Sequence, residues 1–452
     1  MTDQTWGWWR HQAVAAAGPG TSAKEVPQLS RTGAVPFWAL MAFTCLLLLS
    51  PQSFVPAIGA LHLPLLMALL SAGSYILGRW RRGEKALEIG GEMRFAAWLA
   101  AWALLTVPLS LWPGGSVAFF FGIYFKALVV FWLLSRVVDT QDRLRTVCWI
   151  LSLIAAPLAV SGVRSFFSGA FKHEELSHGL ARISGYDASL TGNPNDLALM
   201  LNLILPLSIA LFLMVRGTGP RLLLAALIGL DVVAIIATFS RAGFLSLGII
   251  GVSYLVILFR RGRRNLALLI IAAVLAGTVL LPSAYINRLS TITNIQADQT
   301  NSAQTRFRDY LTAMKYVAHH PLMGAGVGMN ILALNDERGA TWTLVHNVYL
   351  EYSVDLGLPG LILFLLLLRT IVRGLRKALR RAAEIPSLAE LHFLLEGLGV
   401  SLLGFMLSAF FYPDAYQFYF YYIAGLSIAA IAITASMTVG DTAPTGMQTS
   451  ST

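Results

Sequence analysis

Long apolar runs dominate this chain and restrict what it can fold into. A membrane-spanning helix needs about 20 mostly apolar residues, because each helical residue rises about 1.5 Å and the hydrocarbon core is about 30 Å thick. Lipid cannot satisfy exposed backbone polar groups, so such runs must be helices, and they lack the alternation of a β-barrel strand. We therefore expect an all-α, polytopic integral membrane protein with about twelve transmembrane helices. The runs are 35–54, 57–77, 95–111, 117–134, 147–167, 197–215, 222–239, 242–259, 266–281, 348–368, 391–411 and 416–435.

The composition excludes most soluble classes of protein. Hydrophobic residues make up 56% of the chain and charged residues only 12%, whereas roughly 25% of a soluble globular protein is charged. So little charge cannot cover a water-soluble surface, which excludes a soluble multidomain enzyme, a nucleic-acid-binding domain and a disordered chain. The two cysteines, Cys45 and Cys148, each lie within an apolar run and lack the spacing of a metal site.

The distribution of basic residues predicts the orientation. Connections rich in Lys and Arg, at 79–94, 136–145, 216–221, 260–264 and 369–381, alternate with outer connections, of which the short turns at 51–56, 112–116 and 413–415 contain neither residue. By the positive-inside rule the basic connections and both termini are cytoplasmic. Residues 1–34 contain no apolar segment of the signal-peptide kind, and we expect a loose tail. The predicted division is a cytoplasmic tail at 1–34, transmembrane helices 1–9 at 35–281, a large outer loop at 282–347, helices 10–12 at 348–437 and a cytoplasmic tail at 438–452.

The outer loop at 282–347 is long enough to carry a function or to be disordered. It contains a helical pattern, followed by glycines at 324, 326 and 328. We expect a short amphipathic helix near the outer membrane surface, and then a flexible glycine-rich turn. The stripe that defines this helix comprises Arg306, Tyr310, Ala313, Met314 and Val317, and the helix is expected to end at His319-His320-Pro321.

Basic residues on the outer face are contrary to the positive-inside rule, so their presence there has to be explained. Arg241 follows Ser240 in a tight break between two apolar runs, so it must project at the membrane boundary. It either reaches toward the lipid headgroups or binds an anion, because a guanidinium holds phosphate oxygens with two hydrogen bonds and stays charged. Long outer loops carry charge freely, which accounts for four other residues: Lys172, Arg288, Arg308 and Arg338.

Two more arginines lie in separate outer connections. Arg182 precedes a stretch at 191–197 that is typical of a helix start, where Asn195 or Asp196 is expected to cap the sixth span. Arg306 opens the amphipathic helix of the large loop. Together with Arg241, these arginines have the chemistry to converge on one doubly charged phosphate group.

His346 lies where the large loop re-enters the membrane. A histidine at an interface is usually an ordinary polar residue, but beside a phosphate site its unperturbed pKa of about 6.5 suits proton abstraction near neutral pH. Glu351 lies about half a turn round the helix from His346, so a direct pairing would need an irregular helix start. Asp355, close to the Gly-Leu-Pro-Gly stretch at 357–360, is expected to mark a bend in the tenth span.

Five motifs follow one another between residues 192 and 347. They are Gly-Asn-Pro-Asn at 192–195, Ser-Arg at 240–241, the stretch 302–306, His-Pro-Leu at 320–322 with glycines at 324, 326 and 328, and His-Asn at 346–347. In this order they resemble the motifs of O-antigen ligases and polymerases. The plan of about twelve spans with one large periplasmic loop is similar to the whole fold of that family.

The resemblance implies a glycosyltransferase of the inner membrane of a Gram-negative bacterium, which works on the periplasmic face without metal or cofactor. It implies a donor glycan on undecaprenyl diphosphate and, for the ligase class, the lipid A–core of lipopolysaccharide as acceptor. Carried onto this sequence, Arg182, Arg241 and Arg306 would hold the diphosphate, and His346 would activate the acceptor hydroxyl. Four further residues are candidates for supporting roles: Asn195, Ser240, Asn347 and Glu351.

Several alternatives stay open. An O-antigen polymerase uses the same donor, and a protein O-oligosaccharyltransferase is a further variant. The ligase is favoured because the single dominant outer loop carries the histidine near its end. A secondary transporter or lipid flippase fits the number of spans, but the two halves show no internal repeat, and Asp231 and Glu396 are the main acidic residues expected at mid-membrane.

Overall fold

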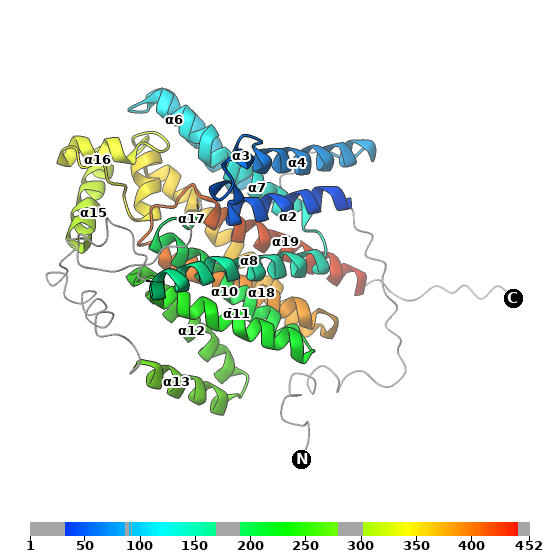
Figure 1. Cartoon of the computed structure of the whole chain (residues 1–452). Helices are drawn as coiled ribbons and strands as arrows, with labels where there is room; N and C mark the ends of the chain where they lie inside the picture. Colours follow the sequence, from blue (N-terminus) through cyan, green and yellow to red (C-terminus); the bar gives the residue numbers. More distant parts are fainter. Residues whose placement is uncertain (1–31, 86–89, 92, 169–189, 279–301, 442–452) are drawn as a thin grey trace, which may run out of the picture.

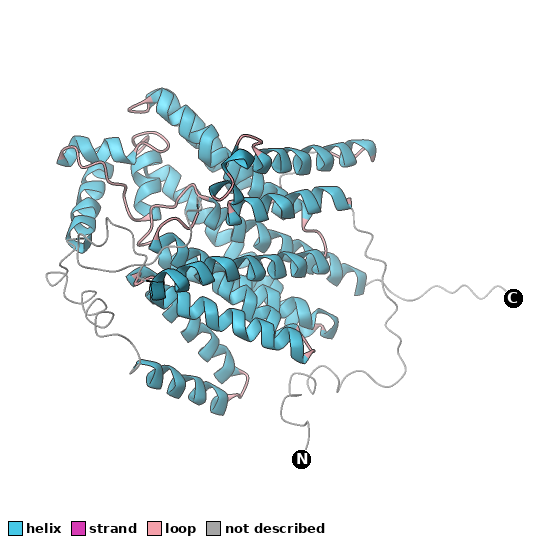
Figure 2. Cartoon of the chain, in the orientation of Figure 1, coloured by secondary structure: helices cyan, strands magenta, loops and turns pink. Residues whose placement is uncertain are grey.

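The computed structural model describes residues 32–85, 90–91, 93–168, 190–278 and 302–441, and every regular element within them is a helix (Figure 2). The all-α membrane fold expected from the sequence is therefore confirmed. The helices are α2 (Ala34–Leu49), α3 (Pro56–Gly59), α4 (Leu63–Arg81), α5 (Arg94–Thr106), α6 (Pro113–Phe119), α7 (Phe125–Val137), α8 (Gln141–Ser168), α10 (Pro194–Met214), α11 (Thr218–Ala237), α12 (Arg241–Arg260), α13 (Arg264–Thr278), α15 (Ser302–His319), α16 (Asn330–Arg338), α17 (Val348–Glu384), α18 (Ala389–Ser408) and α19 (Phe418–Asp441).

The described residues contain 10 helical segments that are long and apolar enough to cross a membrane. They coincide with ten of the runs predicted from the sequence. The run at 95–111 falls on a shorter apolar helix, Arg94–Leu109. The run at 266–281 falls on α13 and continues beyond residue 278, outside the described residues. The chain is thus a multi-pass membrane protein, and the count of twelve spans stays a prediction.

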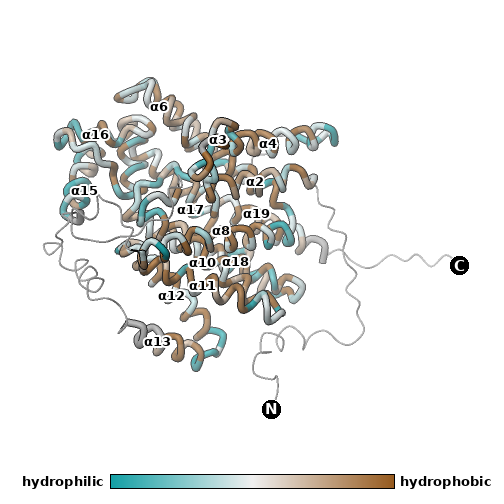
Figure 3. The backbone as a smooth tube through the Cα atoms, viewed as in Figure 1, coloured by the Kyte–Doolittle hydropathy of each residue, from teal (hydrophilic) through white to brown (hydrophobic). Residues whose placement is uncertain are grey.

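The helices of the bundle lie side by side with their ends gathered at two opposite ends of the molecule. Figure 1 shows the start of α2 and the end of α19 at one end, and α15 and α16 at the other. Figure 3 shows mostly hydrophobic residues along the bundle and many hydrophilic ones on α15 and α16. Helices α15 and α16 therefore form a polar cap over one end of an apolar bundle.

Polar contacts join several connections at the end where α2 begins. Thr32 donates its backbone N–H to Asp139 at 3.0 Å, and Arg143 donates to the Thr32 carbonyl at 2.8 Å. Gln141 donates to Glu390 at 3.3 Å. Segments around residues 32, 140 and 390 thus meet at one end of the bundle, as the distribution of basic residues predicts. The assignment of this end to the cytoplasm stays a prediction.

Helix α10 lies at the centre of the bundle, since 83% of its spanning stretch is buried, against 11% for the span that contains α4. Its neighbours approach closely because they present glycine. A Cβ on Gly243 of α12 would lie 2.6 Å from the Ala198 Cβ, and one on Gly397 of α18 would lie 2.8 Å from the Pro206 carbonyl oxygen. Small residues of this kind drive helix association in lipid. Close packing therefore fixes α12 and α18 relative to α10.

Helix α17 bends where the sequence predicts a bend, because Gly357 has a non-helical φ of 67° inside it. The glycine-rich turn fits into this bend, and Gly326 donates its N–H to the Asp355 carbonyl at 2.8 Å. A Cβ on Gly324 would lie 2.7 Å from the same carbonyl oxygen, and a Cβ on Gly357 would meet the Leu322 carbonyl. The turn is therefore packed against α17 instead of forming the flexible connection that we expected.

Helix α15 is the amphipathic helix predicted in the large loop, although its buried face differs from the predicted stripe. Asp309, Ala313 and Tyr316 are buried, whereas Met314 is 49% exposed. The face that packs on the protein is therefore centred near Asp309. A charged residue lies on this face because it has a buried partner, Arg338.

Candidate functional site

Three helices of the bundle begin at the capped end, and each has a side-chain cap. The caps are Asn193 for α10, Ser240 for α12 and Asn347 for α17. The prediction that Asn195 or Asp196 caps α10 is wrong, because Asn193 Oδ1 accepts their two backbone N–H groups at 2.9 and 3.0 Å. The start of a helix carries partial positive charge, so these ends favour a bound anion.

One side of the candidate site, which we call the bundle side, comprises Asn195, Ser240, Arg241 and Tyr412. Ser240 is buried, and its Oγ donates to Asn195 Oδ1 at 2.9 Å. The Tyr412 hydroxyl lies 3.4 Å from Ser240 Oγ. Arg241 follows Ser240 as the first residue of α12, and its side chain is half-buried. The side chains that flank Arg241 are thus held by packed helix ends.

The opposite side, which we call the loop side, comprises Arg306, Tyr310, His346 and Asn347. The Tyr310 hydroxyl on α15 lies 2.6 Å from the His346 carbonyl oxygen and also within hydrogen-bond distance of the Phe410 carbonyl, and its single proton is shared between these two acceptors. The side chain of Asn347 caps the start of α17, where its Oδ1 accepts the Leu350 N–H at 3.0 Å. Tyr310 therefore joins α15, the start of α17 and the end of α18 around His346.

The environment of His346 fixes its ring and its protonation state. Nδ1 lies 3.0 Å from the Leu344 carbonyl oxygen, which only accepts hydrogen bonds, so Nδ1 carries the proton and Nε2 keeps its lone pair. Burial, and then the positive charge of Arg306, lower the pKa of His346 to about 4, with a smaller contribution from Arg338. The ring is therefore neutral at physiological pH, and Nε2 is ready to accept a proton.

Arg306 connects the two sides electrostatically. Its charge lowers the pKa of His346 and, against the raising effect of burial, that of Tyr310. The charge of Arg306 also lowers the pKa of Tyr412, against the raising effect of burial. The physical connection is the stretch 410–412, because the Tyr310 hydroxyl donates to the Phe410 carbonyl and the Tyr412 hydroxyl lies 3.4 Å from Ser240 Oγ. The bundle side and the loop side therefore meet at residues 410–412, which we call the junction.

Acidic residues lie behind this junction. Glu351 is buried and accepts a hydrogen bond from the Ala415 N–H at 3.1 Å, so it supports the turn between α18 and α19 and does not pair with His346. Asp414, in the same turn, is buried, and burial together with the charge of Asp196 raises its pKa. Among the described residues, no group of three or more His, Cys, Asp or Glu side chains is arranged to hold a metal ion.

The structure brings most of the predicted site residues to this end of the molecule. Arg241, Arg306 and His346 lie there with Asn195, Ser240 and Asn347, while Arg182 lies outside the described residues. Sequence reasoning missed Tyr412 and Asp414, for which the only signal was a polar interruption between two apolar runs. It also gave Arg338 no special role, although this arginine is buried beside the segment that carries His346.

The arrangement suits transfer of a group from an anionic leaving group to a hydroxyl. Two guanidinium groups and the helix starts stabilise negative charge, and a neutral imidazole accepts a proton. The site lies at the boundary between apolar helices and a polar cap, where an amphipathic lipid can present its headgroup (Figure 3).

Comparison with known proteins gives one result for this region. Residues 223–365 match the family model described as O-antigen ligase. The match includes Arg241, Arg306, Arg338 and His346, and it excludes α10 and the turn that contains Asp414. No curated protein matches the chain.

Proposed function

We propose that this chain, whose residues 223–365 match the O-antigen ligase family model, transfers a glycan from undecaprenyl diphosphate to the lipid A–core of lipopolysaccharide. The family itself indicates a membrane enzyme of the glycosyltransferase type, with a lipid-linked glycan as donor. The bacterial inner membrane as its location, the periplasmic face as the place of reaction and the identity of both substrates belong to the proposal.

The donor's diphosphate is assigned to Arg241 and Arg306, with Arg182 as a third predicted ligand. Arg241 lies on a packed helix start and Arg306 on the cap, so an anion between them would be held from both sides. The polyprenyl chain would remain in the lipid beside the bundle. Guanidinium groups stabilise the charge that develops on the departing diphosphate, so the residues themselves supply the electrostatic assistance.

His346 is assigned as the general base. Nε2 removes the proton from the acceptor hydroxyl as the hydroxyl oxygen attacks the anomeric carbon, and the bond between that carbon and the diphosphate oxygen breaks. Undecaprenyl diphosphate leaves with the electron pair, and the proton stays on the imidazole until solvent removes it. Such a single displacement inverts the anomeric configuration, so a product that retains the donor's configuration would contradict it.

The observation that carries this proposal is the state of His346. Its Nδ1 proton is directed to the Leu344 carbonyl at 3.0 Å, and its pKa is lowered to about 4 beside Arg306. Such a base is weak in the empty site. A bound diphosphate would offset the positive charge of Arg306 and raise the pKa of His346 toward the range in which general bases work best.

The test is a lipopolysaccharide gel from a strain that lacks the gene and carries either the wild-type chain or His346→Ala. We expect the variant to lose long capped chains while lipid-linked polymer accumulates. Loss of the polymer itself would identify an O-antigen polymerase, and loss of protein glycosylation a protein O-oligosaccharyltransferase. If purified wild-type protein moves the lipid-linked glycan across a bilayer without transfer, the chain is a transporter or flippase.

A further inference from the structure

The segment that leads to His346 has no regular secondary structure, so side chains must hold it in place. Residues 339–347 connect α16 to α17 without a helical turn. Asn335 Oδ1 accepts the backbone N–H groups of Thr341 at 3.1 Å and Trp342 at 3.2 Å. Arg338 Nη2 donates to the Thr343 carbonyl at 2.8 Å and to Thr343 Oγ1 at 2.6 Å. Both anchors come from the last turns of α16.

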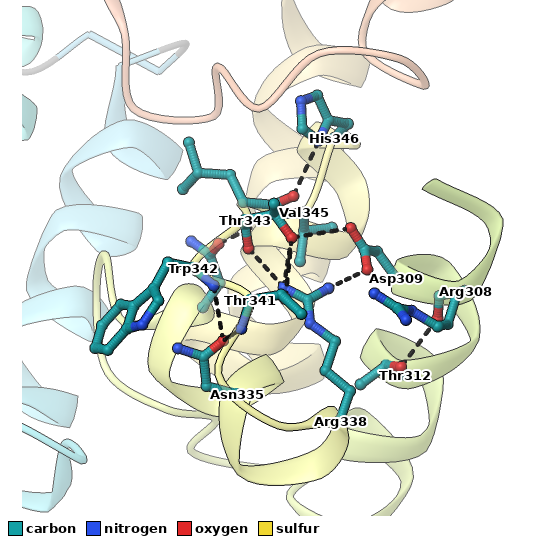
Figure 4. Close-up of polar contacts among 12 residues, drawn as sticks. Arg308, Asp309, Thr312, Asn335, Arg338, Thr341, Trp342, Thr343, Val345 and His346 are labelled. Carbon is teal, nitrogen blue, oxygen red and sulfur yellow. Dashed lines mark hydrogen bonds and ion pairs between the residues drawn. The ribbon is translucent and has the colours of Figure 1, made fainter. Parts of the chain in front are cut away.

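Arg338 is itself held by a buried ion pair. Its Nη1 pairs with Asp309 of α15, and the two side chains are only 4% and 1% exposed. Thr343 Oγ1 donates to the second oxygen of Asp309 at 3.3 Å. The three side chains form one closed set of polar contacts between α15, α16 and the segment (Figure 4). We call this set the Arg338 cluster.

Nearby charged residues do not share this burial. The ion pair between Lys315 and Glu337 joins the same two helices, but the Lys315 side chain is 62% exposed. Arg308, next to Asp309, is also exposed. Burial of two charges costs solvation, and a buried pair commonly adds little net stability relative to apolar side chains. The Arg338 cluster is therefore better explained by the geometry that it imposes than by stability.

We propose that Arg338 is a positioning residue for His346: together with Asp309 and Thr343 it fixes residues 343–345, and thereby the Leu344 carbonyl that orients the imidazole. The inference rests on the proposed function, because it takes His346 as the group that accepts the proton. Figure 4 shows the His346 side chain directed away from the Arg338 cluster, so Arg338 would position the imidazole through the segment, in addition to the small effect of its charge on the pKa of His346.

The path from Arg338 to the imidazole is short. Arg338 holds the Thr343 carbonyl, and the next carbonyl, that of Leu344, accepts the Nδ1 proton at 3.0 Å. Asn330 Oδ1 accepts the Val345 N–H at 3.4 Å, so the segment is also held just before His346. A displacement of about 1 Å at a reacting group can lower a rate about 100-fold. Loss of the Arg338 contacts is therefore expected to affect the chemical step.

The experiment uses the full chain in proteoliposomes with a lipid-linked glycan donor and a lipid A–core acceptor. Arg338→Met leaves Asp309 unpaired and is expected to lower stability, so it is combined with Asp309→Leu to remove both charges. Thr343→Val removes the hydroxyl at nearly constant shape, and Thr343→Ser retains it. Lys315→Met is the matched control, because it breaks the exposed ion pair between the same two helices.

We expect the double variant to unfold at the wild-type temperature while its kcat falls about 10- to 100-fold and its KM for the donor changes less than about 2-fold. Thr343→Val should lower kcat several-fold, whereas Thr343→Ser and Lys315→Met should match the wild type. A merely structural role would move the unfolding temperature and leave the kcat of correctly folded protein intact. Wild-type kcat in the double variant would overturn the positioning role.

The His346→Ala variant separates this inference from the proposed function. If that variant transfers glycan normally, the proposed base is wrong and the positioning role falls with it. If it is inactive while the double variant is fully active, the proposed function stands and only the role of Arg338 is refuted.

Discussion

The two sides of the site are positioned by different physical means. On the bundle side, Ser240 and Arg241 begin a helix that glycine packing seats against α10. On the loop side, His346 follows an irregular segment whose backbone is held by Asn335 and Arg338. An anion needs charged groups on a rigid frame, whereas proton transfer depends on the direction of one lone pair. We infer that Arg241 and Arg306 bind the anion from the two sides, whereas the proton transfer belongs to His346 on the loop side alone.

The largest effect is expected from His346→Ala. Loss of a general base commonly costs about 100- to 10,000-fold in rate, and here we expect it in kcat with little change in the KM for the donor. The measurement is steady-state transfer at several donor concentrations. His346→Gln is the control, because it keeps a polar side chain of similar reach without a basic nitrogen. A variant whose KM rises while kcat is unchanged would place His346 in binding and break the division between the two sides.

Arg241→Ala is expected to have the next largest effect, which should raise the KM for the donor as well as lower kcat. Removal of a guanidinium that binds a doubly charged group should lower kcat/KM for the donor about 100-fold, and insertion and abundance should remain normal. Arg221→Ala is a suitable control, since Arg221 belongs to a connection predicted to be cytoplasmic. Transfer at the wild-type rate by the Arg241 variant would remove this residue from the site.

The pH dependence of glycan transfer tests whether the charge of Arg306 acts on His346. Because the pKa of His346 is lowered to about 4, the imidazole stays neutral until the pH falls to that range. We expect kcat/KM for the donor to be constant from about pH 8 to about pH 5 and to fall below that as the base becomes protonated. In Arg306→Gln one of the lowering charges is lost, so the fall should begin at higher pH. Superimposable profiles would show that Arg306 does not act on His346.

Ser240→Ala should have the smallest effect. It removes the cap of α12 and the hydrogen bond to Asn195, so we expect a loss of about 1 kcal/mol in the free energy of unfolding and a modest rise in the KM for the donor. Thermal unfolding and donor titration measure the two quantities, and Ser253→Ala on the same helix serves as the control. A larger change in kcat than in KM would mean that Ser240 takes part in the reaction.

The sequence predicts the bundle well because hydropathy is a local property. Ten predicted runs coincide with spanning helices, and the bend at Gly357 lies where glycine and proline signal it. The site is less accessible to this reasoning. Arg306 and Arg338 are the same residue type in the same loop, and only the fold shows that Arg338 meets Asp309 across 29 positions of the chain.

Contacts between distant parts of the chain also explain the smaller errors in the sequence predictions. Met314 continues the apolar period of α15, but the burial of Asp309 turns the packed face away from it. Asn195 and Asp196 are good caps by residue type, yet Asn193 is the residue whose extended backbone allows capping. Tyr412 and Asp414 fall in a turn too short to show a pattern, and their surroundings, Ser240 beside Tyr412 and the charge of Asp196 near Asp414, come from distant parts of the chain.

The reciprocal fit of Gly324 and Gly357 has an evolutionary consequence. Gly324 faces the backbone just before Gly357, and Gly357 faces the backbone just before Gly324. A side chain at either position would therefore collide with backbone carbonyl groups, and a substitution of a neighbouring side chain cannot relieve such a collision. Related sequences should therefore keep both glycines or lose both, and a homologue that has replaced one of them should hold its histidine-bearing loop in some other way.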